Sequence, residues 1–147
     1  QARLHSSVYR FVVRTPLGQE DLYIVLDSGE GTLGTLQTAW LKKTLQEAEQ
    51  QDYRHIIVCS HTHLFKTDLS QGLTSNFALE ESYALLHLLA EYQVDLYLCG
   101  HDHHTEDCTF DGVRHIVVGA LQAKQEPSVY MKMSIGQDIQ YQVITVE

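Results

Sequence analysis

The sequence lacks any apolar run of the roughly 20 residues that a membrane-spanning helix needs, because Glu, Gln, Asp or Lys interrupts every candidate. Repeats, low-complexity tracts and linkers rich in Pro, Gly or Ser are also absent. We therefore expect residues 1–147 to form one continuous unit, long enough to bury an apolar core. The first residues read as the start of a strand rather than as the apolar segment of a signal peptide. Because the sequence begins with Gln1 and not with Met, we expect an upstream part in the parent protein, and the cellular compartment stays open.

Positive charge is scarce as well, because 10 Lys and Arg stand against 19 Asp and Glu and give a formal net charge of -9. Such a chain repels nucleic acid and anionic membrane surfaces unless a metal supplies local positive charge. Cys59, Cys99 and Cys108 form no CxxC pair, so neither a disulfide framework nor a zinc ribbon is indicated. We interpret Cys59 and Cys99, which end apolar runs, as small buried hydrophobes.

What is present is a pattern of short strands and two amphipathic helices. Residues 8–14 and 22–27 are rich in β-branched and aromatic side chains around a Pro-Leu-Gly turn, which predicts an antiparallel hairpin. Apolar residues at helical spacing then predict two helices. The first is expected to bury Leu36, Trp40, Leu41, Leu45 and Ala48. The second is expected to bury Phe77, Leu85, Leu88, Leu89 and Tyr92.

Each predicted helix precedes a short apolar strand, over residues 55–59 and 94–99. This order predicts an α/β fold in which helices cover one face of a sheet. Four further strands are expected after the second of these, over residues 108–110, 113–118, 129–135 and 139–146. Asp-Gly and Gly-Gln-Asp turns separate neighbouring strands, so we predict that the tail is an antiparallel meander.

Histidines stand at the ends of the two apolar strands. Ile-Ile-Val-Cys-Ser runs into His61, and Leu-Tyr-Leu-Cys-Gly runs into a His-Asp-His-His segment that begins at His101. Ligands of open α/β sheets gather beyond the carboxyl ends of the strands. Alternate residues of an extended segment point the same way, so His101 and His103 could chelate from one side unless Gly100 turns the chain. We interpret these three histidines as a ligand site.

The other histidines have a simpler explanation. Nine histidines over this length will sometimes fall near one another, and polar residues are common at strand ends. We assign four of them to ordinary structural or solvated positions: His5, His55, His87 and His115.

The strand ends resemble the last two signature motifs of the calcineurin-like metallophosphoesterases, an apolar strand with Ser-His and an apolar strand with Gly-His-x-His. Leu26-Asp27-Ser28 resembles the strand end usually written Leu-Asp-Thr or Leu-Asp-Ser in that superfamily. The segment from Gln37 to Leu45 resembles its Gln-x-x-Trp-Leu helix. The resemblance covers nearly the whole chain, and the Gly-His-x-His element is its most diagnostic part.

The resemblance implies a double-sheet α/β sandwich with two divalent metal ions, such as Mn, Fe or Zn, that hydrolyse a phosphate ester. It implies that His61 and His101 bind one metal and that His103 binds the other. His63, Asp102 and His104 are implied as possible contacts to these ligands or to substrate. The substrate itself stays open between phosphomonoesters and phosphodiesters.

Three other motifs of the superfamily do not occur in this sequence: Asp-x-His, Gly-Asp-x-x-Asp and Gly-Asn-His followed by Asp or Glu. We therefore expect the C-terminal portion of the domain, with little or no activity alone and at most one weakly bound metal. An exposed apolar sheet face then predicts a homodimer or modest stability. Two alternatives stay open: a degenerate fold that binds a protein partner, and a mononuclear metal domain that adds His63 or His104 to the three histidines.

Overall fold

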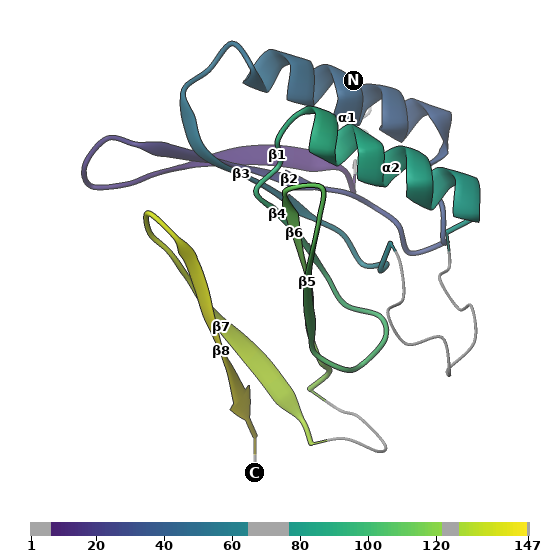
Figure 1. Ribbon diagram of the computed structural model, residues 1–147, viewed down its shortest axis with the longest axis vertical. Coiled ribbons are helices and arrows are strands. Elements are labelled where there is room, and N and C mark those ends of the chain that lie inside the picture. The colour runs from purple at the N-terminus through teal and green to yellow at the C-terminus, as the bar shows by residue number, and fades with distance from the viewer. Residues whose placement is uncertain (1–6, 65–76, 122–126, 147) are drawn as a thin grey trace, which may run out of the picture.

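The computed structural model describes residues 7–64, 77–121 and 127–146. The elements follow in the order β1 (Tyr9–Arg14), β2 (Glu20–Val25), α1 (Gly34–Ala48), β3 (Tyr53–Cys59), α2 (Leu79–Glu91), β4 (Leu96–Cys99), β5 (Glu106–Phe110), β6 (Val113–Val117), β7 (Val129–Ile135) and β8 (Ile139–Thr145). Figure 1 shows both helices on one face of a large sheet and the β7–β8 pair on the other face. The predicted α/β fold is confirmed.

The large sheet has six strands in the order β1-β2-β3-β4-β6-β5. Its four inner strands are parallel, whereas β1 and β5 run antiparallel at the two edges. The pairing of β1 with β2 confirms the predicted hairpin. Because α1 joins β2 to β3 and α2 joins β3 to β4, the carboxyl ends of these three neighbouring strands meet at one edge of the sheet. Every candidate site residue follows one of these ends.

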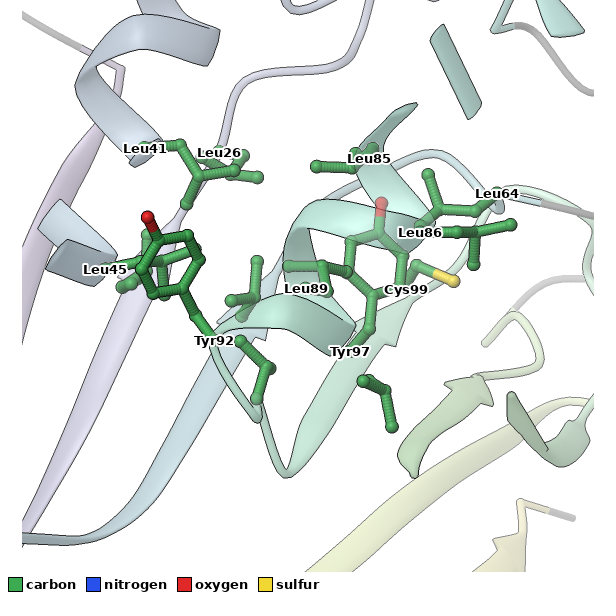
Figure 2. Packing of buried hydrophobic residues seen from close by; sticks show 14 of the residues in the cluster. Leu26, Leu41, Leu45, Leu64, Leu85, Leu86, Leu89, Tyr92, Tyr97 and Cys99 are labelled. Atoms are coloured by element: carbon green, nitrogen blue, oxygen red, sulfur yellow. The ribbon is translucent and has the colours of Figure 1, made fainter. Parts of the chain in front are cut away.

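The main core lies between the helices and the sheet, as Figure 2 shows. The second helix buries Leu85 and Leu89 as predicted, and the flanking residues Phe77 and Tyr92 are buried as well. Leu88 is only partly buried, and Leu86 is buried instead. Each fully buried leucine of this kind stabilises the fold by about 1.5–3 kcal/mol. The helix-covered face therefore provides the rigid base from which the strand ends project.

The predicted burial of Leu36 is wrong, because 87% of this residue is exposed. The buried stripe of α1 consists of Leu41, Thr44, Leu45 and Ala48. At helical spacing that stripe continues back to Gln37, not to its neighbour Leu36, which lies about 100° around the helix. A polar residue therefore occupies the inward position in the first turn.

The second face of the sheet packs against the β7–β8 pair. Three fully buried residues form the centre of this contact: Ile57, Leu96 and Ile116. Two arginines of the main sheet also reach the pair, since Arg54 Nη2 donates to the carbonyl oxygen of Ile135 (3.2 Å) and Arg114 Nη1 donates to that of Ile139 (2.8 Å). The structure thus places helices, sheet and strand pair in three successive layers.

The predicted C-terminal meander is divided in two. β6 pairs in parallel with β4, so β5 and β6 extend the main sheet, and only β7 and β8 pair separately. The residues of β6, Val-Arg-His-Ile-Val, are buried on both faces, whereas those of β7 and β8 alternate. Burial on both faces is typical of a strand inside a parallel sheet, and it distinguishes β6 from the strands that follow it, although Arg114 and His115 interrupt its apolar run.

Candidate functional site

Two loops bring the candidate residues to the carboxyl edge of the sheet. The first histidine loop, residues 60–64, follows β3, and the second histidine loop, residues 100–104, follows β4. Backbone hydrogen bonds continue the pairing of the two strands into these loops. Ser60 N–H donates to the carbonyl oxygen of Leu98 (3.0 Å), and Gly100 N–H donates to that of His61 (3.1 Å).

His61 and His101 meet between the loops. His61 Nε2 lies 3.0 Å from His101 Nδ1, and the two rings are nearly perpendicular at 79°. One neutral imidazole can donate to the other at this distance. Two imidazole nitrogens that bind one metal ion at about 2.1 Å and at a right angle also stand about 3.0 Å apart. The separation therefore fits two ligands that meet at a right angle on an octahedral transition-metal ion, whereas a tetrahedral zinc ion needs about 3.4 Å between them.

His103 follows two residues after His101 on the same loop and is exposed. Both histidines have a left-handed backbone, with φ of 76° at His101 and 61° at His103, so the loop turns instead of continuing as an extended strand. Within residues 7–64, 77–121 and 127–146, no three His, Cys, Asp or Glu side chains gather closely enough to hold a metal. The structure thus joins two of the three predicted ligands and leaves His103 apart from that pair.

Ser28, which follows β2, anchors the first histidine loop. The backbone N–H groups of His61 (3.1 Å) and Thr62 (2.9 Å) both donate to its Oγ, which also lies 2.6 Å from Ser60 Oγ. Thr62 Oγ1 in turn donates to the carbonyl oxygen of Ser28 (2.8 Å). The Leu-Asp-Ser segment after β2 therefore anchors the first histidine loop. Sequence reasoning missed this role, although a hydroxyl residue close behind a strand was a visible signal.

Gln37 of α1 fixes the residue before this serine. Its Oε1 accepts a hydrogen bond from Asp27 N–H (2.7 Å), and its Nε2 donates to the carbonyl oxygen of Asp27 (2.8 Å). Because Gln37 points inward from the helix, its side-chain amide fixes the backbone just after β2. A series of contacts runs from α1 through Asp27 and Ser28 to His61.

Beneath the exposed histidines lies a buried polar group. His63 is 1% exposed, and its Nδ1 lies 3.1 Å from Oδ2 of Asp102 in the second loop. Tyr97, fully buried, donates its hydroxyl to the carbonyl oxygen of Thr62 (2.7 Å). His115 packs beside Tyr97, and burial together with the nearby His63 lowers the pKa of His115 to about 4. The buried positions of His63 and Asp102 favour a role in holding neighbouring residues over contact with substrate.

His104 ends the second histidine loop and contacts an acidic residue. Its Nε2 lies 3.2 Å from Glu106 Oε2, and its Nδ1 lies 3.3 Å from the carbonyl oxygen of Asp102. Burial is the largest single influence and lowers the pKa of His104, but the hydrogen bonds and negative charges of Glu106 and Asp102 together outweigh it, so that the net pKa is raised. The cysteine at the end of β4, Cys99, is buried, and burial raises its pKa to about 12.

Two of the histidines assigned to ordinary positions, His55 and His87, lie outside the two histidine loops, whereas His115 lies beside Tyr97. His55 is buried in β3, and its Nε2 donates to the carbonyl oxygen of Gly136 (2.9 Å). His87 is exposed on α2, with its ring 4.6 Å from that of Tyr83. His5 lies outside the described residues.

No protein-family model matches the sequence, and no curated protein matches it. Solved structures do resemble it. A purple acid phosphatase, PPD1, from yellow lupin (Lupinus luteus) has a TM-score of 0.65 at 18% identity, and the match covers 93% of this chain and 32% of that one. A putative 5'-nucleotidase from Staphylococcus aureus has a TM-score of 0.55 at 20% identity, with 92% and 28% covered. GAP50, described as the anchor in the inner membrane complex of Plasmodium, has a TM-score of 0.57 at 24% identity, with 77% and 36% covered.

The chain shares its fold with these proteins. It spans about a third of the length of each of them. At these identities the likeness establishes the fold alone. The metal roles of His61, His101 and His103 stay predictions. In the part of the chain that the structure describes, no helix has the length and apolarity to cross a lipid bilayer.

Proposed function

We propose that this chain carries one side of the catalytic centre of a metal-dependent phosphoesterase, in which His61 and His101 bind one divalent ion. The 3.0 Å approach of their ring nitrogens, at the carboxyl edge of a parallel sheet, carries the proposal. The fold shared with proteins named as a phosphatase and a 5'-nucleotidase supports it. We assign His103 to a second ion, with Mn, Fe and Zn as the candidate metals.

A divalent ion in such a centre neutralises charge on a phosphate ester and lowers the pKa of a bound water molecule. The chain's own residues hold and orient the ligands. Ser28 fixes the backbone of His61, and the turn at His101 directs its imidazole toward His61. Acidic side chains are needed beside these neutral imidazoles to offset the charge of two metal ions.

Those carboxylates are proposed to come from an N-terminal part of the same domain, where Asp-x-His, Gly-Asp-x-x-Asp and Gly-Asn-His are expected. Among the residues that the structure describes, no group of three potential ligands assembles. We therefore propose that the 147-residue chain hydrolyses phosphate esters weakly or not at all. Efficient turnover of an aryl phosphate by the purified chain with added Mn²⁺ would contradict this point.

Calorimetric titration with Co²⁺ tests the ligand assignment directly. We expect weak binding by the wild-type chain, reduced about tenfold or more by His61→Ala and also by His101→Ala. His87→Ala is the control, because His87 is exposed on α2 and lies outside both histidine loops. Unchanged Co²⁺ affinity in both loop variants would remove the proposal.

A second candidate function, binding of a protein partner, is favoured by the edge strand β1. All six of its residues are exposed, including Tyr9 at 51% and Phe11 at 44%. Phe11 also stacks on Tyr23 with ring centroids 4.9 Å apart. An exposed apolar edge strand is a template for pairing with another chain. We propose that the rest of the domain covers this edge in the parent and that a second copy covers it in the isolated chain.

Sedimentation velocity tests this second candidate, because it separates dimer from monomer. The wild-type chain is expected to dimerise, and Phe11→Lys is expected to shift it toward monomer, because an edge lysine opposes strand pairing. Leu36→Lys is a matched control, since Leu36 is an exposed apolar residue on α1. A wild-type chain that stays monomeric and melts at high temperature would contradict the dimer.

A further inference from the structure

The two histidine loops are connected by a second contact besides the His61–His101 pair. His63 Nδ1 lies 3.1 Å from Asp102 Oδ2, and the two side chains are only 2% and 6% exposed. An ionised carboxylate accepts and does not donate, so the imidazole N–H at Nδ1 is the donor. A buried carboxylate is costly unless hydrogen bonds satisfy it, and this bond therefore fixes the direction of Asp102.

The position of Asp102 in the second histidine loop lets this bond act on two of the proposed ligands. It lies between His101 and His103, both of which have a left-handed backbone. For residues other than glycine this conformation costs about 1–3 kcal/mol each and persists only where the surrounding structure enforces it. A buried, hydrogen-bonded side chain between two such residues is a means of enforcing it.

We propose that the His63–Asp102 contact is a brace that fixes the second histidine loop relative to the first and thereby sets the His61–His101 separation. His63 is two residues from His61, and Asp102 is adjacent to His101, so the brace and the ligand pair connect the same two loops side by side. His63 and Asp102 are positioning residues and do not bind the metal. That the brace serves metal binding rests on the proposed function, whereas its effect on the position of the second histidine loop does not.

Three variants of His63 test the brace. His63→Leu removes the donor and keeps an apolar group of moderate size. His63→Asn restores a donor, because the Asn amide nitrogen can stand near the position of imidazole Nδ1. His63→Gln carries its amide one bond further, toward the position of Nε2, and serves as a second disrupting variant if the Leu variant does not fold. His55→Leu is the matched control, since His55 is another buried, hydrogen-bonded histidine that joins β3 to Gly136 instead.

The first measurement is amide hydrogen exchange in the metal-free chain. In His63→Leu or His63→Gln we expect residues 100–104 to exchange about tenfold faster relative to the amide of Ile57, because the loop opens locally while β3 stays intact. His63→Asn is expected to stay close to wild type. His55→Leu is expected to leave this ratio unchanged. Unaltered exchange of residues 100–104 in the disrupting variants overturns the brace.

The second measurement is Co²⁺ affinity, in which we expect about a tenfold loss for the disrupting variants and recovery in His63→Asn. A loop that exchanges faster with no change in Co²⁺ affinity overturns the positioning role. If the wild-type chain binds no Co²⁺, the proposed metal function fails, and the exchange measurement still decides whether the brace exists.

Discussion

The two histidine loops carry the same type of side chain, an imidazole, but are held in different ways. The first loop has ordinary backbone conformation at His61 and is secured from the neighbouring strand end, through two N–H groups that donate to Ser28. The second loop turns through left-handed conformations at His101 and His103. His61 is thus positioned by hydrogen bonds from its loop backbone, and His101 by a strained turn. The comparison predicts that equivalent substitutions in the two loops will have different, and in one case opposite, effects.

Removal of the first loop's anchor is expected to have the largest effect. Ser28→Ala removes the acceptor of the buried Thr62 N–H and of the part-buried hydrogen bond from His61 N–H. Each unsatisfied group costs about 1–3 kcal/mol, so we expect the free energy of unfolding to fall by about 3 kcal/mol in urea titration.

Ser82→Ala is the matched control for this prediction. Ser82 is also buried, but its hydroxyl has no hydrogen-bond partner among the described residues. Its replacement is therefore expected to change the free energy of unfolding by less than about 1 kcal/mol. Equal losses in the two serine variants would show that Ser28 is an ordinary core residue and not an anchor.

The sequence predicted the positions of both loops because strand ends are local features. The apolar runs before Ser60 and Gly100 define β3 and β4, and the intervening helices make the two strands parallel. The meeting of His61 with His101 follows from that topology. What holds the loops does not follow, because Ser28 and Gln37 act across the fold, from residues that local patterns treat as loop and helix surface.

The remaining errors have the same origin. Leu36 reads as apolar and helical, yet the phase of the helix is set by which residues meet the sheet, and Gln37 takes the inward position. The Asp-Gly turn correctly predicts the hairpin of β5 with β6. The same turn favours a meander. The parallel pairing of β6 with β4 depends on a contact that a turn motif does not encode. Local signals therefore located the candidate histidines better than the residues that support them.

His115, below the first loop, makes that loop's support sensitive to pH. In the unfolded chain its imidazole takes up a proton near pH 6.5, whereas in the folded chain burial and His63 hold the pKa at about 4. The unfolded state therefore binds more protons between these values, and the free energy of unfolding falls as the pH falls from 6.5 to 4. We expect His115→Phe to remove on the order of 2 kcal/mol of this fall, measured by urea titration at pH 7 and pH 4.5.

The other histidines are the same in the wild-type chain and in His115→Phe. The difference between the two profiles of unfolding free energy against pH therefore isolates the contribution of His115. His87→Phe is the control, because this exposed histidine on α2 is expected to leave the wild-type profile unchanged. Parallel profiles for wild type and His115→Phe would mean that the folded chain protonates His115 as easily as the unfolded chain does.

The smallest expected effect is the change in the free energy of unfolding when a histidine is replaced by glycine, and we expect opposite signs in the two loops. His103→Gly relieves a left-handed conformation at φ 61°, and we expect a gain of about 0.5–1 kcal/mol after the extra freedom of glycine in the unfolded chain is subtracted. His61→Gly relieves no such strain and is expected to lose about 1 kcal/mol. Thermal unfolding of the two metal-free variants checks both signs. If His103→Gly also lowers the free energy of unfolding, then the second histidine loop is not under backbone strain. The brace between His63 and Asp102 would then not be needed to hold a strained conformation.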